Sequence, residues 1–165
     1  MAGLHRILWH GALLSALASL LLVVTLRFNP RLYLQDYPPA IQALVPQRTA
    51  EEKRWTMVLG LPFLLLLVAV PLWSTAELRN RQPTLGFFAL ALNAGGVAWV
   101  FNWIDWLLLD WWMFCTITPS LVVIPGSEGS PAYKDYRFHF RGFLIGTLFS
   151  ALAGLAVAAL VVWLA

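Results

Sequence analysis

Two aspartates in a tryptophan-rich stretch are the residues of this chain whose types and spacing best suit chemistry. Asp105 and Asp110 lie in the segment from Asn102 to Cys115, Asn-Trp-Ile-Asp-Trp-Leu-Leu-Leu-Asp-Trp-Trp-Met-Phe-Cys. Carboxylates at membrane depth are costly, so they usually face water or the interior of a helix bundle and mark functional sites. On an α-helix a spacing of five separates the two side chains by about 140°. They can still share one broad polar side with Asn102, although the spacing alone is a weak metal motif.

The same stretch has a second interpretation, because tryptophan is enriched where a membrane meets water. Five tryptophans lie between positions 99 and 112. On this view the aspartates lie among the lipid headgroups, within an interfacial girdle of indole rings. The sequence leaves both interpretations open.

A second polar group follows in the segment Tyr133–Arg141, where aromatic and polar residues alternate. In an extended strand, Arg137, His139 and Arg141 would lie on one side and could bind a phosphate-bearing ligand, with His139 exchanging a proton near neutral pH. In a helix, the segment would be an interfacial anchor whose basic residues face anionic headgroups. The complete candidate polar site is Asn102, Asp105, Asp110, Arg137, His139 and Arg141.

The composition requires lipid as part of the solvent. Of the 165 residues, 60% are hydrophobic and only 12% are charged, whereas a soluble domain carries about 25% charged residues. The single Cys115 excludes an internal disulfide and a cysteine-based metal cluster. Basic residues form no long run, which argues against nucleic-acid binding. The chain also lacks the Walker A, Cys-x-x-Cys and His-Glu-x-x-His motifs, so no catalytic residue, cofactor or metal ligand is assigned.

The elements that must position these residues are four apolar segments, each long enough for a membrane crossing. We expect an all-α integral membrane protein, one membrane domain over 1–165, with two structured loops at 27–54 and 113–141. The first segment continues past a cleavage-like Ala16-Leu17-Ala18, which favours an anchor over a signal peptide. The predicted transmembrane helices are 7–26, 55–75, 85–108 and 142–164.

The positions of lysine and arginine predict the orientation. The two long loops carry eight of these residues, and the N-terminus and the short second loop carry three. We therefore expect both long loops in the cytoplasm and both termini outside, in a plasma or inner membrane. Thr49 and Glu52 match a capping box, which predicts that the second helix begins near Ala50.

Small residues recur at every fourth position of the last helix, which indicates a tight helix crossing. The expected neighbour is the first helix, or the same helix of a second subunit. Pro62 and Pro71 predict a kink in the second helix, and Asn93 near mid-membrane needs a partner or a polar cavity. The repeating residues are Gly142, Gly146, Ser150, Gly154 and Ala158.

Three functions fit these patterns. The first is a non-enzymatic membrane subunit that packs against itself or another membrane protein through the last helix, with lipids around it. The second is a small transporter or channel protomer with a polar path near Asn93, Asn102 and Asp105. The third is an enzyme acting at the level of the lipid headgroups, with Asp105 and Asp110 as acid–base groups or metal ligands.

Overall fold

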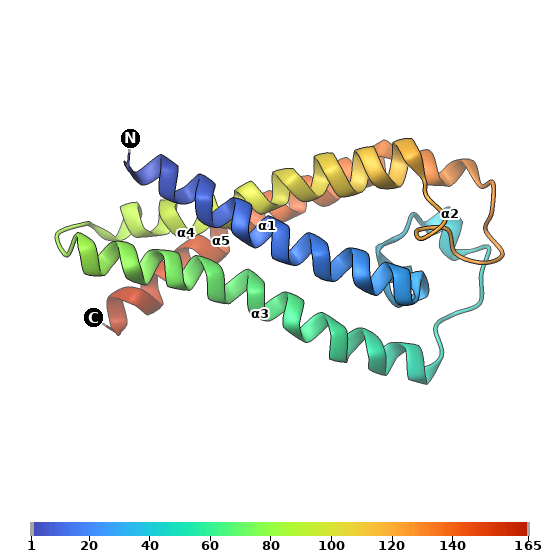
Figure 1. Cartoon of the computed structure of the whole chain (residues 1–165), viewed down its shortest axis with the longest axis horizontal. Helices are drawn as coiled ribbons and strands as arrows, with labels where there is room; N and C mark the ends of the chain where they lie inside the picture. Colours follow the sequence, from blue (N-terminus) through green and yellow to red (C-terminus); the bar gives the residue numbers. More distant parts are fainter. Residues whose placement is uncertain (1, 165) are drawn as a thin grey trace.

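A computed structural model describes residues 2–164, and within that range the chain forms helices and connecting segments without any strand. The long helices form an elongated bundle (Figure 1). Four helical stretches are long and apolar enough to cross a membrane, the third of them by continuing from α4 as far as Ile117. The long helices are α1 (Ala2–Phe28), α3 (Ala50–Arg81), α4 (Phe87–Ile104) and α5 (Tyr136–Trp163).

The third stretch changes its helix type where the tryptophan-rich segment begins. At Asp105, α4 passes directly into the π-helix η2 (Asp105–Ile117). Its last turn is closed by the Thr118 N–H, which donates to the Met113 carbonyl at 2.9 Å, and Thr118 adopts a left-handed φ of 51°. A π-helix bonds each residue to the fifth one along. Residues five apart, such as Asp105 and Asp110, therefore come closer to one face than an α-helix would place them.

The other helices also extend past the apolar cores predicted from sequence. The capping box is confirmed: the Thr49 hydroxyl accepts from the Glu52 N–H at 3.1 Å, and α3 begins at Ala50. At the start of α5, the Asp135 carboxylate accepts from the Phe138 N–H at 2.9 Å. Residues 136–141 are therefore helical, which decides against the extended strand, and the third loop shortens to 118–135.

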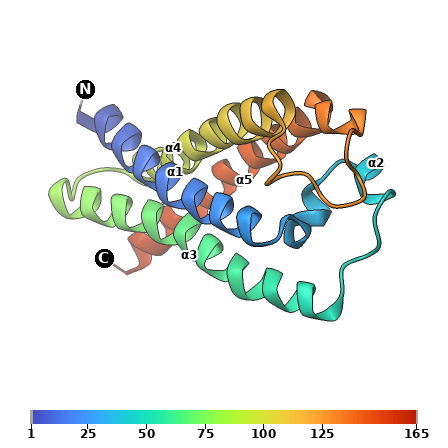
Figure 2. The same ribbon diagram turned by 45° about the vertical axis from the view of Figure 1, so that its right-hand side comes forward.

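The two long connections meet at one end of the bundle. The short α3–α4 connection lies at the other end, with the N-terminal end of α1 and the C-terminal end of α5 (Figures 1 and 2). The long connections pack together through a cluster of buried side chains that includes Tyr37 and Ile124. The Tyr37 hydroxyl donates to the Val122 carbonyl at 2.9 Å. The short elements here are η1 (Pro30–Asp36), α2 (Pro39–Gln42) and η3 (Pro131–Lys134).

The small residues of α5 pack against α4, whereas their spacing had suggested α1 or a second subunit as the neighbour. A Cβ added to Gly154 would lie 2.6 Å from the Ala91 carbonyl oxygen and 2.8 Å from the Gly95 Cα. Gly146 lies against the Asn102 side chain, whose amide donates to the Phe143 carbonyl at 3.1 Å. The α4–α5 crossing is therefore as close as the spacing indicated, but it forms within one chain.

Asn93 finds its partners across a different interface. Its amide donates to the hydroxyls of Ser74 at 3.1 Å and Thr75 at 3.0 Å, just after Pro71 in α3. All three polar side chains are buried. Helix α3 continues through both of its prolines. Asn93 therefore ties α4 to α3 through its amide nitrogen, and its side-chain oxygen is buried without a hydrogen-bond partner among the described residues.

Candidate functional site

A cavity of about 600 Å³ lies at the loop end of the bundle, bounded by α1, α3, η1, α5 and the stretch where α4 becomes η2. Its volume falls within the range of about 300–1,000 Å³ typical of small-molecule sites. Most of its lining is apolar or aromatic. Its acidic, amide and imidazole side chains are Asp36, Asn102, Asp105, Asp110 and His139.

Asp110 and His139 form the central pair of this cavity. The His139 Nδ1 lies 2.9 Å from an Asp110 carboxylate oxygen, and His139 is buried with 5% of its surface exposed. The other ring nitrogen, Nε2, is buried without a hydrogen-bond partner. A proton on Nδ1 would be donated to Asp110 and would leave Nε2 as an acceptor. The pair can therefore hold a donor group of a ligand or accept its proton.

Asp105 lines the same cavity and is only partly buried. Within residues 2–164 its carboxylate has neither a hydrogen-bond partner nor an ion pair. The π-helix explains how it shares a wall with Asp110, five residues later. Asp105 is thus a carboxyl group in a candidate membrane-spanning helix that the described part of the chain leaves without a partner.

A third carboxylate, the exposed Asp36 of η1, lies at the edge of the cavity, and no sequence pattern assigned it to a site. Burial raises the pKa of Asp36, the Arg48 guanidinium lowers it, and the nearby Asp110 carboxylate raises it. Burial also raises the pKa of Tyr37, which lines the cavity beside it. These residues lie in a loop, where neither periodicity nor a motif distinguishes a cavity wall from a solvated turn.

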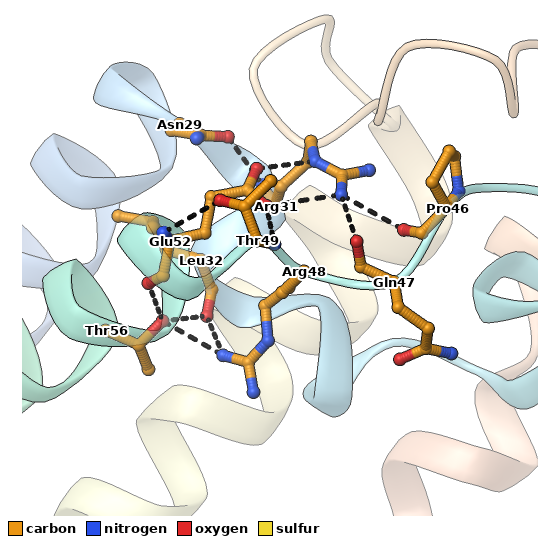
Figure 3. A network of polar contacts seen from close by, with 9 residues as sticks. All are labelled: Asn29, Arg31, Leu32, Pro46, Gln47, Arg48, Thr49, Glu52 and Thr56. Atoms are coloured by element: carbon orange, nitrogen blue, oxygen red, sulfur yellow. Dashed lines mark hydrogen bonds and ion pairs between the residues drawn. The ribbon is translucent and has the colours of Figure 1, made fainter.

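A polar network ties η1 to the segment that leads into α3 (Figure 3). Arg31 Nε donates to the Glu52 carboxylate at 2.6 Å, and the same guanidinium donates to the Pro46 carbonyl at 3.0 Å. Arg48 donates to the Leu32 carbonyl and to the Thr56 hydroxyl, both at 2.9 Å. The first turns of η1 are thereby fastened to the beginning of α3.

Aromatic rings form much of the cavity wall. Trp106 is buried and stacks on Phe143 with ring centroids 4.4 Å apart. Its Nε1 is buried without a hydrogen-bond partner. In contrast, Trp112 is 59% exposed. The tryptophan-rich stretch is therefore divided, with some indole rings facing outward as an interfacial girdle requires and Trp106 facing inward.

The apolar end of the cavity reaches the outer surface of the bundle. Ile145 and Phe149 of α5 line the cavity, yet 57% and 64% of their surfaces are exposed. Phe63 and Leu67 of α3 contribute the opposite wall. A side chain that lines a cavity and remains exposed lies at its mouth, so the cavity opens on the apolar surface beside α5.

The two arginines of the predicted site lie elsewhere. Arg137 and Arg141 are both exposed, one helical turn apart on α5, and neither lines the cavity. His139, between them in sequence, faces inward because the segment is helical. The structure thus brings together Asn102, Asp105, Asp110 and His139 of the six candidates. No group of three or more His, Cys, Asp or Glu side chains suited to a metal ion forms among residues 2–164.

The chain matches no family model, and no curated protein or solved structure matches it.

Proposed function

We propose that this chain is a multi-pass membrane protein that takes an amphipathic molecule from the bilayer into the cavity. The polar end of the molecule lies at Asp105, Asp110 and His139, and its apolar tail lies between α3 and α5. The observation that carries the proposal is a single cavity that joins unpartnered buried polar groups to an opening on the apolar surface. Such a cavity suits a ligand that is itself polar at one end and apolar at the other.

A self-packing membrane subunit and a channel or transporter protomer receive less support from the packing. Three of the small residues of α5 that favoured self-association, Gly146, Ser150 and Gly154, already contact α4. Asn93, which a polar path would need, is held by Ser74 and Thr75 outside the cavity. We further propose that both long loops face the cytoplasm, because they and the adjoining helix ends carry eight of the eleven basic residues.

Photolabelling tests the proposal in protein reconstituted into phosphatidylcholine nanodiscs. The probe is dodecanol carrying a diazirine in its alkyl chain. We expect saturable labelling of α3 around Phe63–Leu67 and of α5 around Ile145–Phe149. Labelling that grows linearly with probe concentration and spreads over all exposed helix faces would reject a binding cavity.

Two glycine variants form a matched pair for this experiment. Gly142 lines the cavity, and a Cβ added there meets no atom within 4 Å. Gly60 in α3 has equally open surroundings but does not line the cavity. Gly142→Leu should therefore reduce the saturable labelling several-fold, whereas Gly60→Leu should leave it unchanged. Equal labelling of both variants would contradict the assignment.

A further inference from the structure

We infer that the polar end of the ligand is an organic cation, such as the ammonium group of a long-chain amine; this inference rests on the proposed function. The cavity presents three carboxylates, Asp36, Asp105 and Asp110. Among its lining residues only His139 can carry a positive charge, and no lysine or arginine contributes to the wall. A phosphate, sulfate or carboxylate headgroup would meet like charges at every acidic side chain.

The arginines near the cavity are engaged elsewhere. Arg31 is paired with Glu52, with 18% and 15% of the side-chain surfaces exposed. Arg48 donates to the Leu32 carbonyl, the Thr56 hydroxyl and the Gln35 side chain. Arg137 and Arg141 are exposed outside the cavity. An anionic ligand would therefore find no free guanidinium in the wall, whereas a cation would compensate carboxylates that the chain leaves in excess.

Two of the unpartnered groups in the wall, Asp105 and His139 Nε2, can accept from a donor on the ligand, whereas the third, Trp106 Nε1, is itself a donor. Asp105 has no partner among the described residues, and the buried Nε2 of His139 is without one as well. With the imidazole proton on Nδ1, facing Asp110 at 2.9 Å, Nε2 is an acceptor. A primary ammonium group has three N–H donors, so it can bind the carboxylate and the imidazole together. A hydroxyl group has one donor and cannot bind both groups at once.

The aromatic wall favours the same class of ligand. The buried Trp106 stacks on Phe143, and Phe114 lies next to His139 with ring centroids 4.7 Å apart. A ring face that is not covered by such a neighbour attracts cations, most strongly where water is excluded. Carboxylates beside aromatic faces, without a cluster suited to a metal ion in the described part of the chain, fit an organic cation better than an inorganic one.

Competition against the neutral dodecanol photoprobe tests whether the charge of the headgroup, rather than partitioning of the alkyl chain into the bilayer, decides binding. At pH 7 in phosphatidylcholine nanodiscs, the competitors are dodecylammonium, unlabelled dodecanol and dodecyl sulfate. We expect dodecylammonium to displace the probe at a concentration about tenfold lower than dodecanol does, and dodecyl sulfate to be the weakest. Equal potency of the ammonium and the alcohol, or a stronger sulfate, would overturn the inference. Loss of saturable probe labelling would instead reject the proposed function.

Charge-removing variants localise the preference. Asp105→Asn should bring the ammonium-to-alcohol ratio towards one, where both potencies are measured against the variant's own saturable dodecanol labelling. The fold should be retained because Asp105 has no partner among the described residues to lose. Glu51→Gln removes the same charge from an exposed site at the same end of the bundle, so its ratio should stay at the wild-type value. A ratio that is unchanged in Asp105→Asn, or that falls equally in both variants, would overturn the assignment to the cavity.

Discussion

The His139 Nδ1 lies 2.9 Å from the Asp110 carboxylate and thereby ties the first turn of α5 to the middle of η2. The imidazole is almost fully buried, and 29% of the Asp110 side-chain surface is exposed. Removing one partner of such a pair leaves a buried polar group without its hydrogen bond. The contact is thus part of the fold as well as of the cavity.

A double-mutant cycle on this pair should give a coupling free energy of about 1–3 kcal/mol. Asp110→Ala leaves the His139 Nδ1 without a hydrogen-bond partner. Asp110→Asn keeps an acceptor oxygen and should therefore lower the unfolding free energy less. The measurement is reversible unfolding in dodecyl sulfate–detergent mixed micelles for Asp110→Ala, His139→Gln and the double variant. Additive losses would show that the two side chains do not interact.

Two glycines of the same α5 pattern should respond in opposite ways to a methyl group. At Gly154 the added Cβ would lie within 3 Å of backbone atoms of Ala91 and Gly95, so Gly154→Ala should destabilise the protein by about 1–3 kcal/mol through overpacking. A Cβ added to Gly142 would meet no neighbouring side chain or helix within 4 Å. Gly142→Ala should therefore stabilise α5 by up to about 1 kcal/mol through helix propensity. The same unfolding assay compares them, and equal effects would contradict the α4–α5 crossing.

The fold was largely predictable because apolar length and small-residue spacing are local properties of a sequence. Four long apolar helices, the Thr49 cap and the close packing of α5 all followed from such patterns. The neighbour of α5 did not follow, because small residues show that a helix is approached but not by which helix.

The site was predictable only in part, for reasons of geometry. An α-helix would have placed the side chains of Asp105 and Asp110 on different faces. The π-helix that begins at Asp105 brings them to one wall, and residue types do not predict that change of helix type. The alternation at 136–141 fitted a strand as well as a helix, and the helix turns His139 inward and its two arginine neighbours outward. Asp36 joined the cavity through loop packing, which leaves no periodic signal.

The Arg31–Glu52 pair should stabilise the conformation of the first long connection (Figure 3). Arg31→Ala removes the bonds to Glu52 and to the Pro46 carbonyl, so amides in the segment 43–53 should exchange hydrogen about tenfold faster, equivalent to ~1.4 kcal/mol. Hydrogen exchange read by mass spectrometry measures this. The control is Arg27→Ala, which removes an exposed charge nearby and should leave these amides unchanged; equal acceleration in both variants would contradict the role of the pair.

The proposed orientation is testable with single cysteines in a Cys115→Ala background, since Cys115 is fully buried and the only native thiol. A membrane-impermeant maleimide should label Gln82→Cys in intact cells, because the proposed orientation places the short α3–α4 connection on the outer side. Gln47→Cys and Ser120→Cys, in the long connections, should react only in inverted vesicles. The reverse pattern would invert the topology and place the polar end of the cavity on the outer side.

Asp36 should remain protonated to a higher pH than an ordinary aspartate, because burial raises its pKa and Asp110 raises it further, against the opposing effect of Arg48. The sign for stability follows from proton binding: the unfolded chain ionises first, near its ordinary pKa of about 3.9. The unfolding free energy should therefore fall as pH rises from that value through the pKa of folded Asp36. Asp36→Asn should lose less stability over this interval than the wild type does.

The same titration links Asp36 to the ligand. Dodecylammonium stays charged from pH 4 to 8, so a rise in its competition strength over this range reports ionisation of the cavity carboxylates. Asp36→Asn should remove part of that rise, and Asp110→Asn should shift the remaining Asp36 step to lower pH by removing a neighbouring negative charge. Infrared spectroscopy of the protonated-carboxyl band follows the same step without ligand. A band that titrates like a solvated aspartate, and is unmoved in Asp110→Asn, would separate Asp36 from the cavity electrostatically.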